Sequence, residues 1–347
     1  MIKEEMDMQF SVRHALGSYN VYCERGALSH IGDHFALDRR VLIVTDTGVP
    51  AEYAKAVAKC CQTPTIVTVA QGEESKSLAG LELLCETMLK NDFTRSDCVV
   101  AVGGGVVGDL ACFAASAYMR GIDFYNVPTT VLSAVDSSVG GKSGVNFNGV
   151  KNILGAFYQP KGVLFDADVL KTLPARQISA GLAEAIKMAL TFDAPLFETF
   201  ERGEVNDALY ESLIFRAVQL KAAVVEKDER EGGLRKTLNF GHTFGHAVEA
   251  AGELGLLHHG ECVALGMIPF CSEAVYKRLL PVLKRFDLPS AIPFDMERAF
   301  PYLTHDKKWG KGGVDCIFVR EIGSFEIKKL TKDELLKTIT DAKNRFI

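Results

Sequence analysis

The chain has 347 residues, of which 48% are hydrophobic and 24% charged, an ordinary globular composition that excludes wholesale disorder. This length exceeds what one compact core usually holds, so we expect two domains. The net charge of −5 gives no indication of nucleic acid or of an anionic membrane as a partner.

The cysteines and the apolar stretches bear on the compartment. The nine cysteines are scattered and contain no Cys-x-x-Cys pair, a pattern typical of free thiols in a reducing environment. The first eight residues are acidic and have no apolar core, so they do not resemble a signal peptide. The most apolar stretch, 98–119, contains four glycines and an aspartate and is not expected to span a membrane. We therefore expect a cytoplasmic protein.

The first half of the chain alternates short apolar runs with helix-period patterns. Buried strands are predicted at 41–46, 65–69, 98–102 and 163–166, the last run being the sheet's final strand. Helices are predicted between them at 51–61 and 78–90. Such alternation favours an α/β domain with a parallel sheet.

The pattern becomes helical after Pro174. Helices are predicted at 176–191, 206–227, 239–251 and 261–276. The runs 314–319 and 324–327 predict a small hairpin, and Thr331 to Glu334 a capping box that opens the last helix. We therefore predict an α/β domain at 1–174 and a mainly α-helical domain at 175–347, with a site between the two as the default expectation.

A glycine-rich turn, Gly103-Gly-Gly-Val-Val-Gly-Asp109, follows a predicted strand and precedes a helix predicted at 110–118. Glycines there let backbone N–H groups approach a pyrophosphate at the positive end of the helix, which predicts a Rossmann-like nucleotide site. A tight turn that binds nothing is the alternative. Asp46 ends an earlier strand, where it could accept ribose hydroxyls, although the usual dinucleotide order places this acid after the turn.

Two more polar loops follow apolar runs, at 72–76 and 128–130. Because the carboxyl ends of parallel strands share one edge of a sheet, we expect these loops beside the glycine turn. Either loop alone is more often a solvated turn.

A Gly-His pair occurs twice, four residues apart, in Asn239-Phe-Gly-His242-Thr-Phe-Gly-His246. His242 and His246 are predicted one turn apart on a single helix face. The two glycines would each cost about 1 kcal/mol inside a helix, so close packing or a ligand near the backbone must require them. This spacing favours a metal site over two unrelated histidines.

Further candidate ligands lie elsewhere in the second half. His258 and His259 follow the histidine motif, and Glu184 and Lys187 are the only charged residues of a helical stretch at 177–190. That helix is expected to be largely buried. An ordinary ion pair between the two, worth about 0.2–0.5 kcal/mol, is the alternative. One glutamate with two or three histidines suits an open Zn²⁺ site, but spacing does not decide which histidines ligate.

Basic residues gather in or beside these motifs. If several share a cleft in an acidic protein, the substrate carries phosphate, carboxylate or both. The residues are Arg120, Lys142, Lys151, Lys187, Lys221, Arg235, Lys307 and Lys308.

In combination, these motifs resemble the 3-dehydroquinate synthase branch of the sugar-phosphate cyclase family. The resemblance covers nearly the whole chain, and its specificity comes from the number and order of the motifs. They are 41–46, Gly72-Glu-x-x-Lys76, the glycine turn, Pro128-Thr-Thr130, Asp136-Ser-Ser-Val-Gly-Gly-Lys142, 151–157, Gly181-x-Ala-Glu-x-Ile-Lys187, 238–246, 259–267 and 305–308. Two departures are the extra His258 and Val150, which stands where many relatives have glycine.

The resemblance implies roles for matching residues. The metal ligands would be Glu184, His242 and His259, with His246 a polar active-site residue. The NAD site would comprise Asp46, Glu73, Lys76, Gly104, Gly105, Val106, Gly108, Asp109, Thr129, Thr130, Lys142, Lys151, Thr172 and Leu173. The substrate and catalytic residues would be Asp136, Lys142, Asn152, Lys187, Lys221, Arg235, Asn239, His246 and Lys307 or Lys308, with Arg120 reaching in from a second subunit of a homodimer.

The family's reaction explains why one chain would hold NAD and a divalent metal, Zn²⁺ or Co²⁺. Its substrate is a phosphorylated seven-carbon acid of the shikimate pathway, and the steps are transient oxidation, phosphate elimination, re-reduction and intramolecular aldol closure. Rival interpretations are another sugar-phosphate cyclase, an NAD- and metal-dependent glycerol or alcohol dehydrogenase, and a catalytically inactive NAD-sensing protein. A dehydrogenase would have no use for Lys142, Lys151, Lys221 and Arg235, and an inactive protein need not keep the metal ligands.

Overall fold

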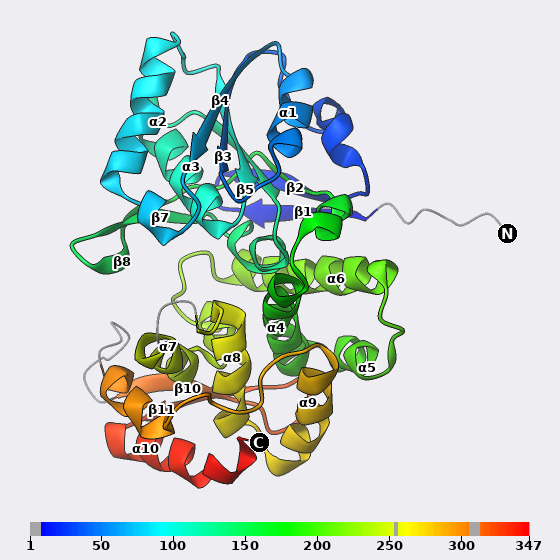
Figure 1. Ribbon diagram of the computed structural model, residues 1–347, viewed down its shortest axis with the longest axis vertical. Coiled ribbons are helices and arrows are strands. Elements are labelled where there is room, and N and C mark those ends of the chain that lie inside the picture. The colour runs from blue at the N-terminus through cyan, green and yellow to red at the C-terminus, as the bar shows by residue number, and fades with distance from the viewer. Residues whose placement is uncertain (1–7, 253–255, 305–312, 347) are drawn as a thin grey trace, which may run out of the picture. The chain divides into compact units, whose positions relative to one another are not determined.

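The computed structural model describes residues 8–252, 256–304 and 313–346 (Figure 1). The chain divides into two compact units, residues 1–173 and 174–347, and each is described by itself. All nine cysteines are free thiols. None of the helices in the described ranges combines the length and the apolar character needed to cross a bilayer.

The first unit is built on a seven-stranded sheet with the order β1-β2-β9-β6-β5-β3-β4 (Figure 1). β1 and β2 form an antiparallel hairpin at one edge, and from β2 onward every neighbouring pair is parallel. The strands are β1 (Gln9–His14), β2 (Gly17–Cys23), β3 (Arg40–Asp46), β4 (Thr63–Val69), β5 (Cys98–Gly103), β6 (Asp123–Pro128) and β9 (Gly162–Phe165). The four predicted strands are confirmed to within two residues, and the hairpin and β6 are additions.

Three helices accompany the sheet: α1 (Ala51–Lys59), α2 (Leu78–Lys90) and α3 (Gly105–Ala117). α2 has the predicted bounds, and the Ser77 side chain caps it by accepting a hydrogen bond from the Gly80 N–H. The start predicted for the helix after the glycine turn is wrong, because α3 begins at Gly105 and not at Leu110. The glycines therefore form its first turn, which places free N–H groups at the end of β5.

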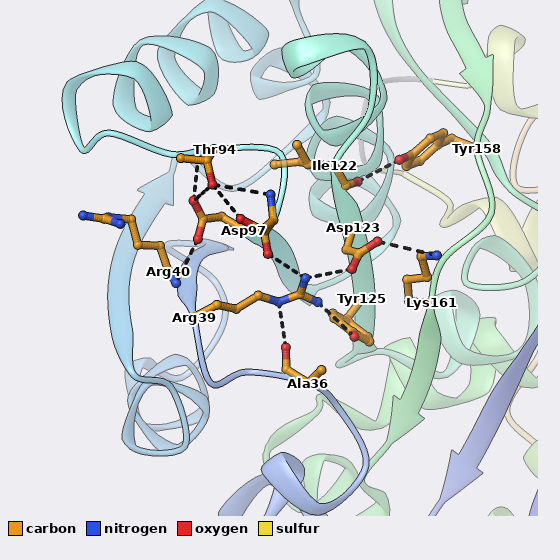
Figure 2. A network of polar contacts seen from close by, with 11 residues as sticks. Ala36, Arg39, Arg40, Thr94, Asp97, Ile122, Asp123, Tyr125, Tyr158 and Lys161 are labelled. Carbon is orange, nitrogen blue, oxygen red and sulfur yellow. Dashed lines mark hydrogen bonds and ion pairs between the residues drawn. The ribbon is translucent and has the colours of Figure 1, made fainter.

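A polar network fixes the amino ends of the central strands (Figure 2). The Arg39 guanidinium donates to the Ala36 and Ser96 carbonyls, to the Asp123 carboxylate at 2.8 Å and to the Tyr125 hydroxyl. The Asp97 carboxylate accepts from the Arg40 N–H, which ties the start of β3 to that of β5. These charges are satisfied within the fold, so this end of the sheet serves stability and leaves the carboxyl end for binding.

A second hairpin, β7 (Lys142–Phe147) and β8 (Val150–Phe157), was not predicted. Its turn is the Asn148-Gly149 pair, and both residues have positive φ, 49° and 74°. Asn-Gly is the preferred sequence for a two-residue hairpin turn that needs two such angles. The sequence therefore carries a local signal for this hairpin.

In its described residues the second unit is mainly helical and carries one antiparallel hairpin, β10 (Val314–Phe318) with β11 (Glu326–Leu330). α4 packs against α6 and α8, and α7 packs against α8. The helices are α4 (Ala175–Phe192), α5 (Ala194–Arg202), α6 (Asp207–Lys227), α7 (His242–Ala251), α8 (His259–Met267), α9 (Glu273–Arg285) and α10 (Lys332–Asp341). The capping box predicted at Thr331 and Glu334 opens α10.

Two helix predictions in this unit are wrong. The helix predicted at 239–251 begins only at His242, because Gly241 before it has a φ of 77°. The helix predicted at 261–276 is two helices: α8 ends at Met267, a short 3₁₀ turn contains Pro269, and Ser272 caps α9. Proline cannot donate the N–H that would continue α8, which explains the break.

Candidate active site

The glycine turn lies at a point where the order of the sheet reverses. From β3 the chain adds β4 on one side and then crosses to add β5 on the other. Asp46 at the end of β3 and Gly103 at the end of β5 therefore flank a topological switch point, where open α/β sheets bind their ligands.

Gly103 and Gly104 have different roles in this turn. A side chain at Gly103 would lie 2.6 Å from Val107 Cβ, so this glycine is required by packing. At Gly104 the nearest atom to an added Cβ is 3.6 Å away, on Thr130, and Gly104 has an extended backbone with φ −76°. The fold does not require glycine there, and the space that a Cβ would fill lies at the N-terminus of α3. The turn thus fits a bound phosphate group.

Charged residues around this turn are paired. Lys76 Nζ lies 2.5 Å from Asp109 Oδ2, and Lys76 is only 4% exposed. Burial raises the pKa of the Asp109 carboxyl, against the opposing effect of the Lys76 ammonium. Asn146, which was not predicted, joins the loop to the hairpin: its side chain donates to Glu73 Oε1 at 2.9 Å, and its N–H donates to the Lys76 carbonyl.

Other predicted NAD residues also hold the local backbone. The buried Asp46 carboxylate accepts from the Gly48 N–H at 2.7 Å, and the Thr130 hydroxyl accepts from the Ser133 N–H. The Thr129 N–H donates to the Gly103 carbonyl, and the Thr172 hydroxyl lies 2.6 Å from that of Tyr53. Val106 and Gly108 lie in the first turns of α3, and Leu173 follows the 3₁₀ turn that contains Thr172.

Several predicted substrate residues of this unit lie on unusual backbone. Asp136 belongs to a π-helical turn, Ser133–Ser137, a geometry frequent at functional sites. Arg120 and Asn152 have positive φ, 68° and 52°, which costs about 1–3 kcal/mol each in non-glycine residues and concentrates at functional sites. Lys142 and Lys151, at the starts of β7 and β8, have exposed side chains.

In the second unit the predicted metal ligands come together. His242 Nε2 lies 3.6 Å and His259 Nε2 3.7 Å from Glu184 Oε1. Two ligands on one tetrahedral Zn²⁺, with bonds of about 2.0–2.1 Å, are separated by about 3.3–3.5 Å. Glu184 is 1% exposed, and its Oε1 has no hydrogen-bond donor among the described residues. A buried carboxylate oxygen beside two imidazoles therefore fits a divalent ion.

His246 belongs to the same cluster. Ligand atoms of His242, His246 and His259 all lie within 4.8 Å of one another. The described geometry therefore leaves His246 within reach of an ion, and its role as a polar residue rather than a ligand stays a prediction. Lys187 contacts the Glu184 carboxylate, so the ion pair considered for these two residues exists, in a buried helix as expected.

Close helix packing explains the glycines of the histidine motif. An added Cβ at Gly245 would lie 2.8 Å from the Cys262 carbonyl oxygen, and one at Gly241 would lie 2.8 Å from that of Val263. α7 thus contacts the backbone of α8 directly. Of the two explanations considered from the sequence, packing holds here. His242 and His259 are the first residues of these two helices.

Each of the two histidines is held through its other ring nitrogen. His242 Nδ1 lies 3.1 Å from the Phe240 carbonyl, and His259 Nδ1 lies 2.9 Å from Glu249 Oε2. Both partners accept a hydrogen bond from an Nδ1–H group, which leaves Nε2 without a proton and available as the ligand atom. Sequence reasoning missed Glu249, because a partner ten residues from His259 has no local spacing signal. His258 caps α8, its N–H bonded to Glu261, and Arg176 from α4 holds that carboxylate.

Buried cations lie in the same unit. Lys187, Lys221 and Arg235 are 2%, 5% and 2% exposed. Buried charges require anionic or strongly polar partners. The Asp228 carboxylate accepts from the Arg235 N–H, and the Asn239 side chain donates to Glu231 Oε1 at 2.9 Å. The predicted phosphate residues Lys307 and Lys308 lie outside the described residues.

Comparison with known proteins decides the family. The family models for the 3-dehydroquinate synthase N-terminal and C-terminal regions match residues 66–180 and 181–309. The chain is 40% identical to a 3-dehydroquinate synthase of Pelobacter propionicus, covering 92% of this chain and 95% of the relative. It is 41% identical to one of Enterococcus faecalis, covering 94% and 97%.

The chain belongs to the 3-dehydroquinate synthase family. Among solved structures it is similar to a 2-deoxy-scyllo-inosose synthase complexed with carbaglucose-6-phosphate, NAD⁺ and Co²⁺, with a TM-score of 0.86, 26% identity and coverage of 96% and 99%. It is also similar to the 2-epi-5-epi-valiolone synthase of Streptomyces hygroscopicus with NAD⁺ and Zn²⁺ bound, with a TM-score of 0.82, 28% identity and coverage of 97% and 99%. A probable glycerol dehydrogenase from Sinorhizobium meliloti, 15% identical with a TM-score of 0.64, shares the fold alone. The predicted fold class, an α/β unit with a mainly helical unit, is confirmed.

Proposed function

We propose that this chain is a lyase that converts 3-deoxy-D-arabino-heptulosonate 7-phosphate to 3-dehydroquinate and phosphate, in the shikimate pathway. The observation that carries the proposal within this family is the cluster of Glu184, His242 and His259 in a unit that also buries three cations. When bound, NAD supplies a reversible hydride acceptor, and Zn²⁺ or Co²⁺ supplies Lewis acidity.

The residues of the chain bind and orient the substrate. Lys221 and Arg235 hold the carboxylate, and Arg235 can do so through two parallel hydrogen bonds. Lys142 and Asn152, with Lys307 or Lys308, hold the phosphate. The side chains that contact hydroxyls and ring positions are Asp136, Lys187, Asn239 and His246.

The NAD site is assigned to the glycine turn and its neighbours. Backbone N–H groups at Gly104 and Gly105 receive the pyrophosphate, and Asp46 receives ribose hydroxyls. Lys76 and Asp109 already form a buried pair, so their part is to hold the loop beside the cofactor. In the elimination step the departing phosphate's own oxygen takes the proton, so this step needs no dedicated carboxylate base.

We further propose a cytoplasmic homodimer in which Arg120 serves the neighbouring subunit's site. Arg120 is exposed, and Met119 before it and Gly121 after it also have positive φ, 48° and 118°. Strained positive-φ backbone of this kind concentrates at functional sites, where it directs a side chain toward its ligand. This proposal is tested by measuring the oligomeric state, which should be a dimer, and the phosphate affinity of Arg120→Ala, which should be weakened.

The deciding experiment supplies the heptulosonate phosphate with NAD at catalytic concentration and follows both phosphate and NADH. Phosphate release over many turnovers without net NADH is expected. Stoichiometric NADH would support a dehydrogenase instead. Equal turnover of a sugar phosphate that lacks the carboxylate would support another cyclase, and Arg235→Gln should then have no selective effect on the acid.

A further inference from the structure

We propose that Glu24, His30 and His34 form a second site for a divalent transition metal such as Zn²⁺, in the first unit. One ligand atom from each of the three residues lies within 4.8 Å of the others. None of the three takes part in the proposed reaction, and the cluster shares no residue with that of Glu184.

Local sequence brings the three residues together. Glu24 follows the last residue of β2, and its N–H donates to the Phe165 carbonyl, which extends the pairing with β9. His30 and His34 flank a 3₁₀ turn, Ile31–Asp33. Their N–H groups donate to the carbonyls of Ala27 and Ile31, at 3.1 Å in both cases. Main-chain hydrogen bonds therefore fix the backbone of each candidate ligand residue.

The connecting loop is held by a buried carboxylate. Asp166, only 2% exposed, accepts from the Gly26 N–H at 2.8 Å and from the Leu28 N–H at 3.0 Å. Gly26 has a φ of 78°, which lets the chain turn back toward Glu24. The spacing between Glu24 and His30 therefore follows from the fold.

The side chains already point at one another. The Glu24 carboxylate accepts a hydrogen bond from each ring, Oε1 from His30 Nε2 at 2.7 Å and Oε2 from His34 Nε2 at 3.0 Å. A bound ion would replace these two hydrogen bonds and move the ligand atoms apart to about 3.3–3.5 Å. The His34 ring packs on Tyr22, with ring centroids 4.3 Å apart, which limits its rotation. The side chains of Glu24 and His30 are 45% and 40% exposed, so an ion can reach them from solvent.

Metal binding requires Nε2 of each imidazole to lose its proton to Nδ1 or to solvent. Ser29 Oγ lies 3.3 Å from His30 Nδ1 and donates its own proton to the Gly26 carbonyl. Its lone pairs can therefore accept an Nδ1–H, so the tautomer that frees Nε2 as a ligand has a hydrogen-bond acceptor once an ion replaces the Nε2–H bond to Glu24.

Two imidazoles and one carboxylate form a common Zn²⁺ ligand set, with remaining positions for water. An ion there would cross-link the end of β2 to the following 3₁₀ turn. Because it binds the folded chain, it would raise the melting temperature with metal concentration.

The test uses the full chain stripped of metal and dialysed against Zn²⁺. Wild type is expected to bind two equivalents per chain, and His30→Gln and His34→Ala one each, with turnover unchanged. His14→Ala, which changes a partly exposed histidine on β1 outside the cluster, is the matched control and should keep both equivalents. In a His242→Ala background, Zn²⁺ should still raise the melting temperature, and adding His30→Gln should remove that rise.

Retention of the second equivalent in both His30→Gln and His34→Ala would overturn the proposal. So would a wild type whose bound Zn²⁺ disappears entirely with His242→Ala. Circular dichroism is used to check that each variant is folded. If His34→Ala loses its fold along with the Tyr22 contact, His30→Gln at the more exposed position decides alone.

Discussion

The glycine turn of the first unit and the histidine cluster of the second offer their ligands different groups. Around Gly104 the candidate binding groups are main-chain N–H groups, and the space for a ligand exists because a side chain is missing. Around Glu184 the binding groups are side chains, each directed by another residue. The first arrangement tolerates changes in neighbouring side chains and fails when a Cβ is added. The second fails when any one ligand is removed.

The sharpest way to break this comparison is to remove a metal ligand. Glu184→Ala and His259→Ala should each abolish bound metal and lower kcat by about 10³-fold or more, the scale for losing a main electrostatic stabiliser. Metal content and kcat measure this. Glu198→Ala, an exposed glutamate on α5, is the control. Full metal occupancy in either ligand variant would refute the assignment.

Removing a residue that directs a ligand should have an intermediate effect. Glu249→Gln weakens the hydrogen bond that fixes the His259 ring, and metal affinity should fall about 10–100-fold. Competition with a chelator of known affinity measures the change. An unchanged affinity would mean that the α7–α8 packing alone directs His259.

Adding a methyl group in the glycine turn tests whether its main-chain N–H groups bind NAD. Gly104→Ala should weaken NAD binding about tenfold, or about 1.4 kcal/mol, while changing stability by less than about 1 kcal/mol. Gly103→Ala is the matched control, since its Cβ meets Val107 and should destabilise the fold by about 1–3 kcal/mol. Equal NAD affinity in Gly104→Ala and wild type would show that the turn binds no phosphate.

The smallest effect concerns the support of α8. Burial works to raise the pKa of Glu261, but hydrogen bonds from Arg176 and from the His258 N–H outweigh it, and the pKa lies below 4.5. A lowered pKa stabilises the folded state above the unfolded value, and this contribution disappears as the pH falls through the folded value. Glu261→Gln should therefore lower stability by about 1 kcal/mol at pH 7 and by progressively less below pH 4.5, as urea unfolding measures. A pH-independent difference would contradict this.

Much of the fold could be predicted because its main elements have strong local patterns. The strands β3 and β5 are continuous apolar runs, and α2 has a serine cap before a regular helical pattern. β1 was missed because its residues are mostly exposed or partly exposed, so no apolar run marks it. The break after α8 was missed because the helical spacing of apolar residues continues across Pro269, although the backbone cannot continue its helical hydrogen bonds there.

The site divides in a similar way. Glu184, His242 and His259 were available from motif order, and the distances among them agree with a shared ion. Glu249 and Asn146 were not, because their partners lie at separations that no local motif marks, 10 residues for Glu249 and 73 for Asn146. The sequence left two explanations open for the glycines of the histidine motif, and the packing of α7 against α8 accounts for them.

The contact between α7 and α8 bears on how the candidate metal ligands are held. An added Cβ at Gly266 would collide with the carbonyl of Gly241, and one at Gly260 would collide with that of Ala180 in α4. The backbone separation at these contacts sets how far His242, His259 and Glu184 stand from one another. The spacing of the ligand atoms therefore depends on the contact between the helices, and Gly266→Ala is expected to weaken metal binding although it alters no ligand.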